Sequence, residues 1–248
     1  NCPGSVSNFS INIIPGPSIN AQQDLFYCAN SPISALPFTG TASNYSWTNT
    51  NTTIGLPSNG TGTSLPAFIS SNLDSIYAVA SISVIPIIDT GLLTCVGLPE
   101  IFEIHILPVP NVDSITNQEL CSGVSNNQVV FDGTVVNTQF QWQHNGSSLP
   151  LPSNGTGNIG AYTLTNTTAT PLQVAFQVTP VVSAGSLSCP GAPLNFNWTI
   201  LPQPNILSFG PLVYCTGTNV AAQGFSGSAN TYTWVNTNTS TGLLASGQ

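Results

Sequence analysis

The sequence repeats itself at intervals of 93 and 94 residues, and this period constrains the fold more than any other feature. Cysteines recur in two series with these steps. The first series opens a Cys-x-Gly motif and contains Cys2, Cys95 and Cys189, and the second contains Cys28, Cys121 and Cys215. Between them, a Phe-x-Gly motif is followed each time by an aromatic-x-Trp motif that ends at Trp47, Trp142 and Trp234. Matches in one constant order indicate a tandem array of a single structural unit.

A Pro-x-Pro motif closes each unit and places the boundaries, ending at Pro17, Pro110 and Pro204. We predict two complete repeats, at 18–110 and 111–204. We expect residues 1–17 to be the closing strand of a preceding repeat and 205–248 to be the first part of a following one. A single strand is not stable alone, so we expect that the protein continues at both ends or, alternatively, that 1–17 completes a neighbouring molecule.

Apolar and polar residues alternate with a period of two through most of each repeat, which indicates strands rather than helices. Leu172, Val174, Phe176 and Val178, for example, point to one face, and Gln173, Gln177 and Thr179 point to the other. The strands predicted for the first repeat are 19–27, 33–39, 44–49, 63–69, 76–85 and 101–107, with one more between 50 and 60. Turn residues such as Ser-Asn-Gly separate them. About seven short strands with a Trp on the third predict an antiparallel Ig-like sandwich.

The fold prediction is therefore an all-β chain of tandem Ig-like sandwich domains arranged as beads on a string. The three recurring tryptophans occupy one framework position, so we expect them in the cores rather than on a sugar-stacking surface. These residues are Trp47, Trp142 and Trp234.

The composition excludes several functions. The chain has no Lys or Arg and 8 acidic residues, giving a formal net charge of −8. Nucleic-acid binding through phosphates needs cations, and Schiff-base, P-loop and kinase chemistry all need Lys, so we expect none of them. The longest apolar stretch, 76–88, is interrupted by serines and Pro86 and is too short to span a bilayer. We expect no membrane insertion.

The motifs together carry a family resemblance. Cys-x-Gly, Phe-x-Gly, Tyr-x-Trp, Ser-Asn-Gly-x-Gly and the closing Pro-x-Pro resemble the PKD-like, Ig-like repeats of giant surface proteins in gliding Bacteroidetes. The nearest likeness is the gliding-motility adhesin class exported by the type IX secretion system. One departure is clear: true PKD domains continue from the Trp strand into an acidic Gly-Asp-Gly turn, whereas Trp47 is followed by Thr-Asn-Thr-Asn. The resemblance therefore implies no metal-binding role for this turn.

The resemblance also implies a cellular location, partners and a modification. It implies an extracellular, cell-surface protein whose partners are the neighbouring repeats of its own chain and, through other parts of the protein, the outer-membrane secretion and motility machinery. The O-glycosylation pattern of these bacteria, Asp followed by Ser or Thr and an aliphatic residue, fits Ser75 and Ser114. These two hydroxyls are the candidate acceptors.

Six cysteines in a chain without Lys or Arg favour disulfides in an oxidising environment. Two pairings are open. We favour bonds within each repeat, Cys28–Cys95 and Cys121–Cys189, 67 and 68 residues apart, with Cys2 and Cys215 pairing outside this sequence. The alternative joins cysteines at a constant separation of 26 and consists of Cys2–Cys28, Cys95–Cys121 and Cys189–Cys215.

Ionisable residues predict neither a cofactor nor catalysis. Five acidic residues gather around the 110/111 junction: Glu100, Glu103, Asp113, Glu119 and Asp132. They are not repeated one unit later, whereas a calcium ion that stiffens junctions should recur with them, so we expect no calcium there. His105 and His144 also lack counterparts, and no G-x-S-x-G motif occurs. We expect no zinc site and no enzyme activity.

The function predicted from these features is that of a structural stalk within a large secreted cell-surface adhesin, serving attachment or gliding motility. What recurs along the chain is framework, not a site. The alternatives are that each repeat is a carbohydrate-binding module, which predicts a row of exposed aromatic side chains, or that the chain is a subunit of a self-assembling extracellular filament.

Overall fold

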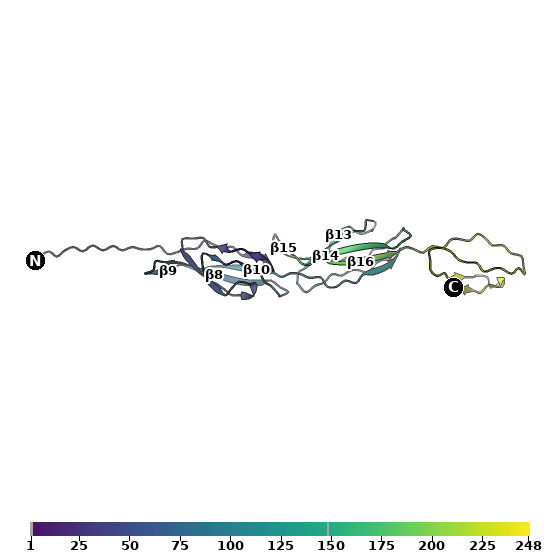
Figure 1. Ribbon diagram of the computed structural model, residues 1–248, viewed down its shortest axis with the longest axis horizontal. Helices are drawn as coiled ribbons and strands as arrows, with labels where there is room; N and C mark the ends of the chain where they lie inside the picture. Colours follow the sequence, from purple (N-terminus) through teal and green to yellow (C-terminus); the bar gives the residue numbers. More distant parts are fainter. Residues whose placement is uncertain (1, 148) are drawn as a thin grey trace. The chain divides into compact units, whose positions relative to one another are not determined.

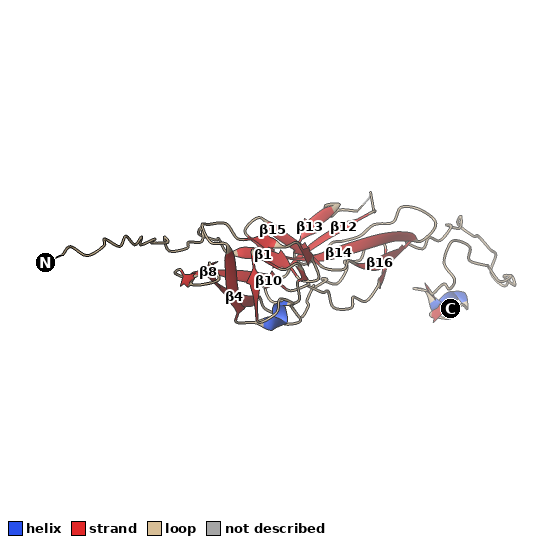
Figure 2. Ribbon diagram, turned by 60° about the vertical axis from the view of Figure 1, so that its left-hand side comes forward, coloured by secondary structure: helices blue, strands red, loops and turns tan. Residues whose placement is uncertain are grey.

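The computed structural model describes residues 2–147 and 149–248, and its regular structure is built from β-strands (Figures 1 and 2). The helical segments within these residues are two short 3₁₀ helices, η1 (Thr52–Ile54) and η2 (Thr239–Thr241). No helix in the described part of the chain is long and apolar enough to cross a membrane. The predicted all-β class is confirmed.

The first complete repeat forms a mixed sheet with the order β1-β10-β8-β4-β5, and β9 adds to β8. Its strands are β1 (Leu25–Cys28), β4 (Asn44–Asn49), β5 (Asn59–Gly62), β8 (Ala78–Asp89), β9 (Thr94–Val96) and β10 (Glu100–Leu107). β1 runs parallel to β10, while the other pairs are antiparallel. The antiparallel arrangement predicted for all strands is therefore wrong for β1. Alternation shows which residues face inward but not the direction of the neighbouring strand.

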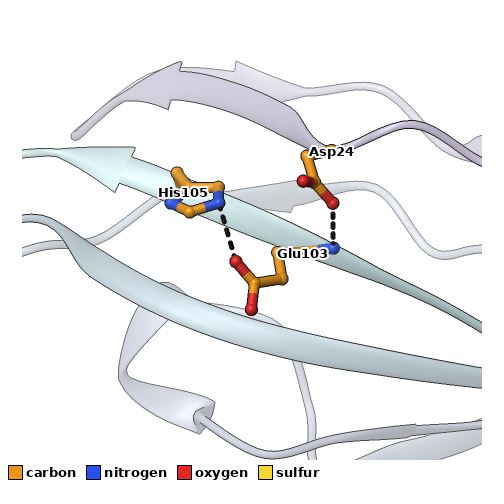
Figure 3. Close-up of side chains that lie close together, drawn as sticks. All are labelled: Asp24, Glu103 and His105. Atoms are coloured by element: carbon orange, nitrogen blue, oxygen red, sulfur yellow. Dashed lines mark hydrogen bonds and ion pairs between the residues drawn. The ribbon is translucent and has the colours of Figure 1, made fainter.

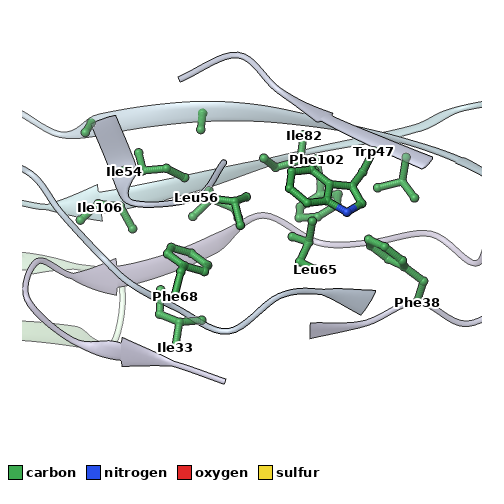
Figure 4. Close-up of a cluster of buried hydrophobic side chains, with 14 of the residues drawn as sticks. Ile33, Phe38, Trp47, Ile54, Leu56, Leu65, Phe68, Ile82, Phe102 and Ile106 are labelled. Atoms are coloured by element: carbon green, nitrogen blue, oxygen red, sulfur yellow. The ribbon is translucent and has the colours of Figure 1, made fainter. Parts of the chain in front are cut away.

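Two short strand pairs cover the inner face of this sheet and complete a sandwich. They are β2 (Pro32–Ile33) with β7 (Phe68–Ile69), and β3 (Leu36–Pro37) with β6 (Ser64–Leu65). Side chains of both layers meet in one apolar core, in which Trp47 and Phe102 of the sheet lie opposite Leu65 (Figure 4). Trp47 is 3 % exposed. Burial at about 25 cal/mol per Å² of apolar surface is the main force that holds the layers together.

The second repeat builds the same sheet from equivalent segments, in the order β11-β16-β14-β12-β13 with β15 on β14. The strands are β11 (Gln118–Cys121), β12 (Gln139–His144), β13 (Asn154–Thr156), β14 (Leu172–Ala184), β15 (Leu187–Pro190) and β16 (Leu194–Leu201). β11 is parallel to β16, as β1 is to β10. Trp142 and Trp198 are buried in this core.

One segment interpreted as a turn is a strand. The motif Leu-Pro-Ser-Asn-Gly-Thr-Gly appears in both repeats, and its Asn-Gly dipeptide predicted a turn. In the structure Asn59 and Gly60 lie in β5, where Gly60 is the partner of Trp47. A β-carbon at Gly60 would lie 2.5 Å from Cζ2 of Trp47, so the glycine is required by the indole ring that covers it.

Residues 205–248 contain only part of the framework. They form η2 and the pair β17 (Trp234–Val235) with β18 (Ser246–Gly247). Trp234 is half-buried, so its prediction as a core residue is wrong in this structure. The reason is that 205–248 include no counterparts of β8 and β10, the strands that supply seven of the sixteen buried residues in the core around Trp47.

The compact units of the structure are divided differently from the sequence repeats. The first unit contains residues up to Ser114 together with 131–141 and 178–194, and the second contains 115–130, 142–177 and 195–248. The first unit therefore includes β15, the adjoining end of β14 and the segment 131–141 of the second repeat. The repeat boundaries at 18–110 and 111–204 stay a prediction.

Candidate functional site

Within the first compact unit, a disulfide bond joins two consecutive sequence repeats. It links Cys28, at the end of β1, to Cys189, in β15, across 161 residues with a Cα–Cα distance of 5.5 Å. Cys189 is 2 % exposed and Cys28 is half-buried. The remaining cysteines are free, and they are Cys2, Cys95, Cys121 and Cys215.

This bond corrects the predicted pairing, because Cys28–Cys95 and Cys121–Cys189 are not formed. Cys28 lies beside Leu107 at the end of β10 where β8 begins with Ala78, whereas Cys95 pairs with Ile88 near the far end of β8. The ten residue steps from Ala78 to Ile88 span about 33 Å at about 3.3 Å per residue. A disulfide needs Cα atoms within about 7 Å, so the two ends of one sandwich cannot be bridged.

The alternative pairing fails as well, since Cys189 is bonded to Cys28 and not to Cys215, and Cys95 and Cys121 are both free. It assumed that the bonded cysteines lie on either side of one Pro-x-Pro segment. In the structure the bond instead spans nearly two periods of the repeat.

Apolar side chains surround the disulfide. Leu107, Val135 and Val182 are buried with Cys189, and Ala184 and Leu187 pack against them. Two hydrogen bonds flank this cluster. The Tyr77 hydroxyl donates to the Ser183 carbonyl oxygen at 3.1 Å, and the Val136 N–H donates to the Ser75 carbonyl oxygen at 3.2 Å. The junction of the two repeats is thus packed, hydrogen-bonded and covalently closed.

The Pro-x-Pro segment at this junction is also packed rather than free. Pro108 and Pro110 are buried. A β-carbon at Gly191 would overlap the carbonyl oxygen of Pro110 and lie 3.0 Å from Cγ of Pro180, so only glycine permits this close approach. The Gly191 N–H donates to the Pro180 carbonyl oxygen at 2.8 Å. The Cys-x-Gly motif therefore receives the linker that closes the preceding repeat.

A second cluster consists of Asp24, Glu103 and His105 on β10 and the segment before β1 (Figure 3). Nε2 of His105 lies 3.0 Å from Oε2 of Glu103, and the Glu103 N–H donates to Oδ1 of Asp24 at 2.8 Å. The His105 ring stacks on Phe26 with 4.5 Å between ring centroids and 9° between ring planes. Within the described residues this is the one group of three potential metal ligands that lie close together.

The geometry gives this cluster a structural explanation. The Asp24 carboxylate satisfies the backbone of β10, and in the second repeat the amide oxygen of Asn117 accepts the N–H of Asn197 at 2.8 Å in the same way. The equivalents of the three cluster residues are therefore Asn117, Asn197 and Thr199, which include no carboxylate or imidazole. Of the five acidic residues considered around the 110/111 junction, only Glu103 belongs to a group of three potential ligands in the described chain.

His144 replaces an asparagine of the framework. Its Nε2 donates to the Pro152 carbonyl oxygen at 2.9 Å, and its Nδ1 accepts the Gly146 N–H at 3.0 Å. At the equivalent place in the first repeat, the Asn49 side chain donates to Pro57 and accepts from Asn51. His144 therefore supports a loop through both ring nitrogens, and within the described residues it belongs to no group of three potential metal ligands.

The other predicted site residues lie apart from these clusters. Ser75 and Ser114 are exposed, and Ser75 lies at the rim of a cleft that also includes Asp74, Pro108 and Val135. Trp47 and Trp142 are buried, so they form no stacking surface for sugars. The junction disulfide is the feature that sequence reasoning missed. The two cysteine series recur equally for a bond between repeats and for a bond within one repeat, so their spacing alone does not reveal the junction bond.

Comparisons with known proteins give no family assignment. No model of a known protein family matches the chain, and no curated protein matches it. Solved structures with a similar trace include human protocadherin-24 EC1-2, at 11 % identity over 77 % of this chain and 99 % of that chain, with a TM-score of 0.38. A titin fragment of domains I67–I69, in an E-to-A mutated variant, is similar at 7 % identity over 77 % of this chain and 68 % of its own, with a TM-score of 0.42. Human CDH23 EC21-23 is similar at 10 % identity over 86 % and 80 % of the two chains, with a TM-score of 0.41.

Proposed function

We propose that this chain is a structural spacer, a run of β-sandwich repeats that forms part of a secreted cell-surface adhesin. The observation that carries the proposal is the closed junction, in which the Cys28–Cys189 bond ties one repeat to the next and the linker ending at Pro110 is buried. A spacer must transmit force through its junctions, and a covalent bond with a packed linker does so without depending on a ligand.

The residues of each repeat support a passive role. The features that recur are core tryptophans, the glycine that receives the indole, buried amides and the linker-receiving glycine, all of which serve packing. Both histidines have structural partners, so the proposal assigns the chain no catalytic step. Function resides in sites rather than folds, and here the framework itself is what the chain preserves.

The finer parts of the proposal rest on the resemblance of the repeat motifs to those of gliding Bacteroidetes. We propose that the protein lies outside the cell, that it is exported by the type IX secretion system, and that it meets the outer-membrane motility machinery through other parts. Ser75 and Ser114 are the proposed O-glycan acceptors, and both are exposed. Intact-mass measurement of the protein secreted by such a bacterium, with Ser75→Ala and Ser114→Ala as controls, tests the modification.

Pulling the chain by its two ends tests the spacer proposal. The bonded cysteines are 161 residues apart in sequence, and the segment between them cannot extend while the disulfide is intact, which removes about 560 Å of contour length at about 3.5 Å per residue. We expect the oxidised chain to be shorter than the reduced chain by this amount when both are fully unfolded by force. Equal lengths would contradict the proposal, and so would saturable binding of the folded chain to a glycan array.

A second candidate function is a filament subunit, and one observation favours it. Phe9, Ile11 and Ile13 alternate with polar residues as the buried residues of β10 and β16 do, yet they are 76–86 % exposed. A segment with this alternation can complete a sheet in another molecule. Light scattering over a concentration series decides between the two functions, because only the filament proposal predicts a mass that grows with concentration.

A further inference from the structure

The free cysteines of the two complete repeats are the equivalents of the bonded pair. Cys121 occupies in the second repeat the position that Cys28 has in the first, and Cys95 occupies in the first the position that Cys189 has in the second. The bond of this structure thus joins a strand cysteine of one repeat to a hairpin cysteine of the next. Each complete repeat contains one cysteine of each kind.

The backbone of the strand cysteine is the same in both repeats. Cys28 is the register partner of Leu107 in the parallel pair β1–β10, and Cys121 is the partner of Leu201 in β11–β16. The residue after each cysteine donates its N–H to that leucine's carbonyl oxygen at 2.9 Å, from Ala29 and from Ser122 respectively. Cys121 is exposed at the end of its strand. Cys121 therefore lies at the same position on its strand as Cys28, the position from which Cys28 reaches its partner.

The hairpin cysteine is equally well reproduced. Cys95 is the partner of Ile88 in β8–β9, as Cys189 is of Val182 in β14–β15. Two residues later, Gly97 donates to the Pro86 carbonyl oxygen at 3.0 Å. A β-carbon at Gly97 would overlap the Pro17 carbonyl oxygen, just as one at Gly191 would overlap that of Pro110. The Cys95 hairpin therefore receives a linker in the manner of the Cys189 hairpin.

We propose that the Cys28–Cys189 bond is one instance of a disulfide that closes every junction between consecutive repeats, and that Cys121 and Cys95 are the two halves of further junctions. Cys121 forms a disulfide with the hairpin cysteine of a repeat that follows. Cys95 forms a disulfide with the strand cysteine of a repeat that precedes. The inference rests on the proposed function in one respect, namely that the repeats work in series. The required ligand is the thiol of an equivalent repeat, in the same chain or in a second copy.

The chemistry needs an oxidant, which we name as a small disulfide such as oxidised glutathione. The thiolate of one cysteine attacks a glutathione sulfur, forming a mixed disulfide and releasing one glutathione thiolate. The thiolate of the second cysteine then attacks the protein sulfur and releases the other glutathione. Two protein thiols lose two electrons and two protons, and one oxidised glutathione becomes two reduced ones.

Adding one repeat to the full chain tests the inference. A second copy of 111–204, inserted directly after Pro204, places a hairpin cysteine where Cys121 needs one. The present chain has six cysteines and four free thiols, and the insertion adds two cysteines. After refolding with oxidised glutathione at low protein concentration, we expect the number of alkylated thiols, counted by intact mass, to remain four. Six alkylated thiols would overturn the proposal.

A matched variant identifies the bond. In the extended chain, Cys121→Ser should leave the Cys189 of the inserted copy without its partner, so we expect five alkylated thiols with that cysteine among them on peptide mapping. An insertion at the other end, a copy of 18–110 placed between Pro17 and Ser18, tests Cys95 in the same manner, and again we expect four alkylated thiols. Loss of the β-sheet signal in both extended chains would also contradict the inference, because it requires repeats to be interchangeable.

The second source of the thiol is another copy of the chain. At high protein concentration, oxidation of the unextended chain should produce covalent dimers that contain a Cys95–Cys121 bond if the two repeat ends can meet between molecules. Dimers that survive Cys95→Ser would count against the inference, because their bond would lie elsewhere. None of these outcomes depends on extension under force, so failure here is distinguishable from failure of the spacer proposal.

Discussion

The two complete repeats keep the same buried amide although their sequences differ around it. The Asn72 side chain donates to the Ile76 and Ile106 carbonyl oxygens, and Asn166 donates to those of Thr170 and Ile200, all at 2.7–2.8 Å. Each amide oxygen also accepts a backbone N–H two residues further on, at 2.9 Å. A loop is thereby fixed to the last strand of the sheet in both repeats.

Where the sequences of the repeats differ, other residue types make the equivalent hydrogen bonds, or the contact is absent from one repeat although the fold is the same. His144 makes the bonds of Asn49, and Asn117 makes the bond of Asp24. The contact of Glu103 with His105 has no counterpart, because the second repeat has Asn197 and Thr199 there. The two repeats therefore preserve the hydrogen bonds that side chains make to the backbone, but they do not preserve surface charge. This pattern is typical of a structural framework rather than of a binding site.

The cysteines make the largest difference between equivalent positions, since Cys28 is bonded and Cys121 is free. Cys28→Ser should lower the free energy of unfolding by about 5 kcal/mol, the loop-closure value for the 161 residues that the bond encloses. Cys189→Ser should have the same effect because it removes the same bond. Denaturant unfolding without reductant measures the change.

Cys121→Ser is the matched control, and we expect it to change stability by less than about 0.5 kcal/mol because it removes no bond. An equal loss for Cys28→Ser and Cys121→Ser would break the comparison. It would mean that the sulfur stabilises through packing at the strand end instead of through the crosslink.

The next largest effect is expected at the buried amides. Asn72→Ala leaves the Ile106 carbonyl oxygen without its donor in a buried site, and a buried orphan of this kind costs about 1–3 kcal/mol. With the other two bonds lost as well, we expect about 3 kcal/mol for Asn72→Ala and a similar loss for Asn166→Ala. Thermal unfolding of both variants beside Asn59→Ala, whose side chain is exposed, measures the difference. A loss confined to one repeat would show that the amides are not equivalent.

The glycines opposite the tryptophans should have a smaller effect. A methyl group at Gly60 or Gly155 overlaps the six-membered ring of Trp47 or Trp142, and overpacking of this kind costs about 1–3 kcal/mol. We expect Gly60→Ala and Gly155→Ala to cost about 2 kcal/mol each, with reduced near-ultraviolet signal from the displaced indole. Gly160→Ala is the control, because its nearest neighbour would be a ring carbon of Tyr162 at 3.9 Å. Tolerance of all three changes would contradict the proposed role of the motif.

Much of the fold follows from the sequence because alternation reports burial directly. The prediction of 44–49 matches β4, and those of 76–85 and 101–107 match β8 (Ala78–Asp89) and β10 (Glu100–Leu107) to within a few residues. Asn59 and Gly60 were read as a turn because local propensity favours one, and the ring of Trp47 overrides that preference. Propensity is a weak guide wherever a large side chain decides the packing.

The junction could not be predicted in the same way. Spacing along the chain placed Cys28 and Cys95 at a separation suited to an Ig domain, but a bond depends on which ends of the strands meet. Because β1 is parallel to β10, Cys28 lies at the end of the repeat that adjoins Pro108 and Pro110. Periodicity contains no information on strand direction. The acidic residues around the 110/111 junction do not recur with the period, and the absence of calcium there stays a prediction.

The smallest expected effect is a pH dependence of stability that the first repeat has at Tyr27 and the second repeat lacks. Tyr27 pairs with Ile106 in β1–β10, and Leu120 pairs with Ile200 at the equivalent place in β11–β16. Burial raises the pKa of the Tyr27 phenol, because desolvation disfavours the phenolate. Below the ordinary tyrosine value of about 10 both the folded and unfolded chains hold the proton. Above it the unfolded chain releases the proton first, so the contribution of Tyr27 to stability falls as pH rises through the raised pKa.

The measurement is the decrease in the urea unfolding midpoint between about pH 8 and about pH 10.5. We expect this decrease to be smaller in Tyr27→Leu, which copies the second repeat, than in the parent chain. Tyr77→Leu serves as the comparison, and an equal fall in the parent and in Tyr27→Leu would show that the phenol is not the group that titrates.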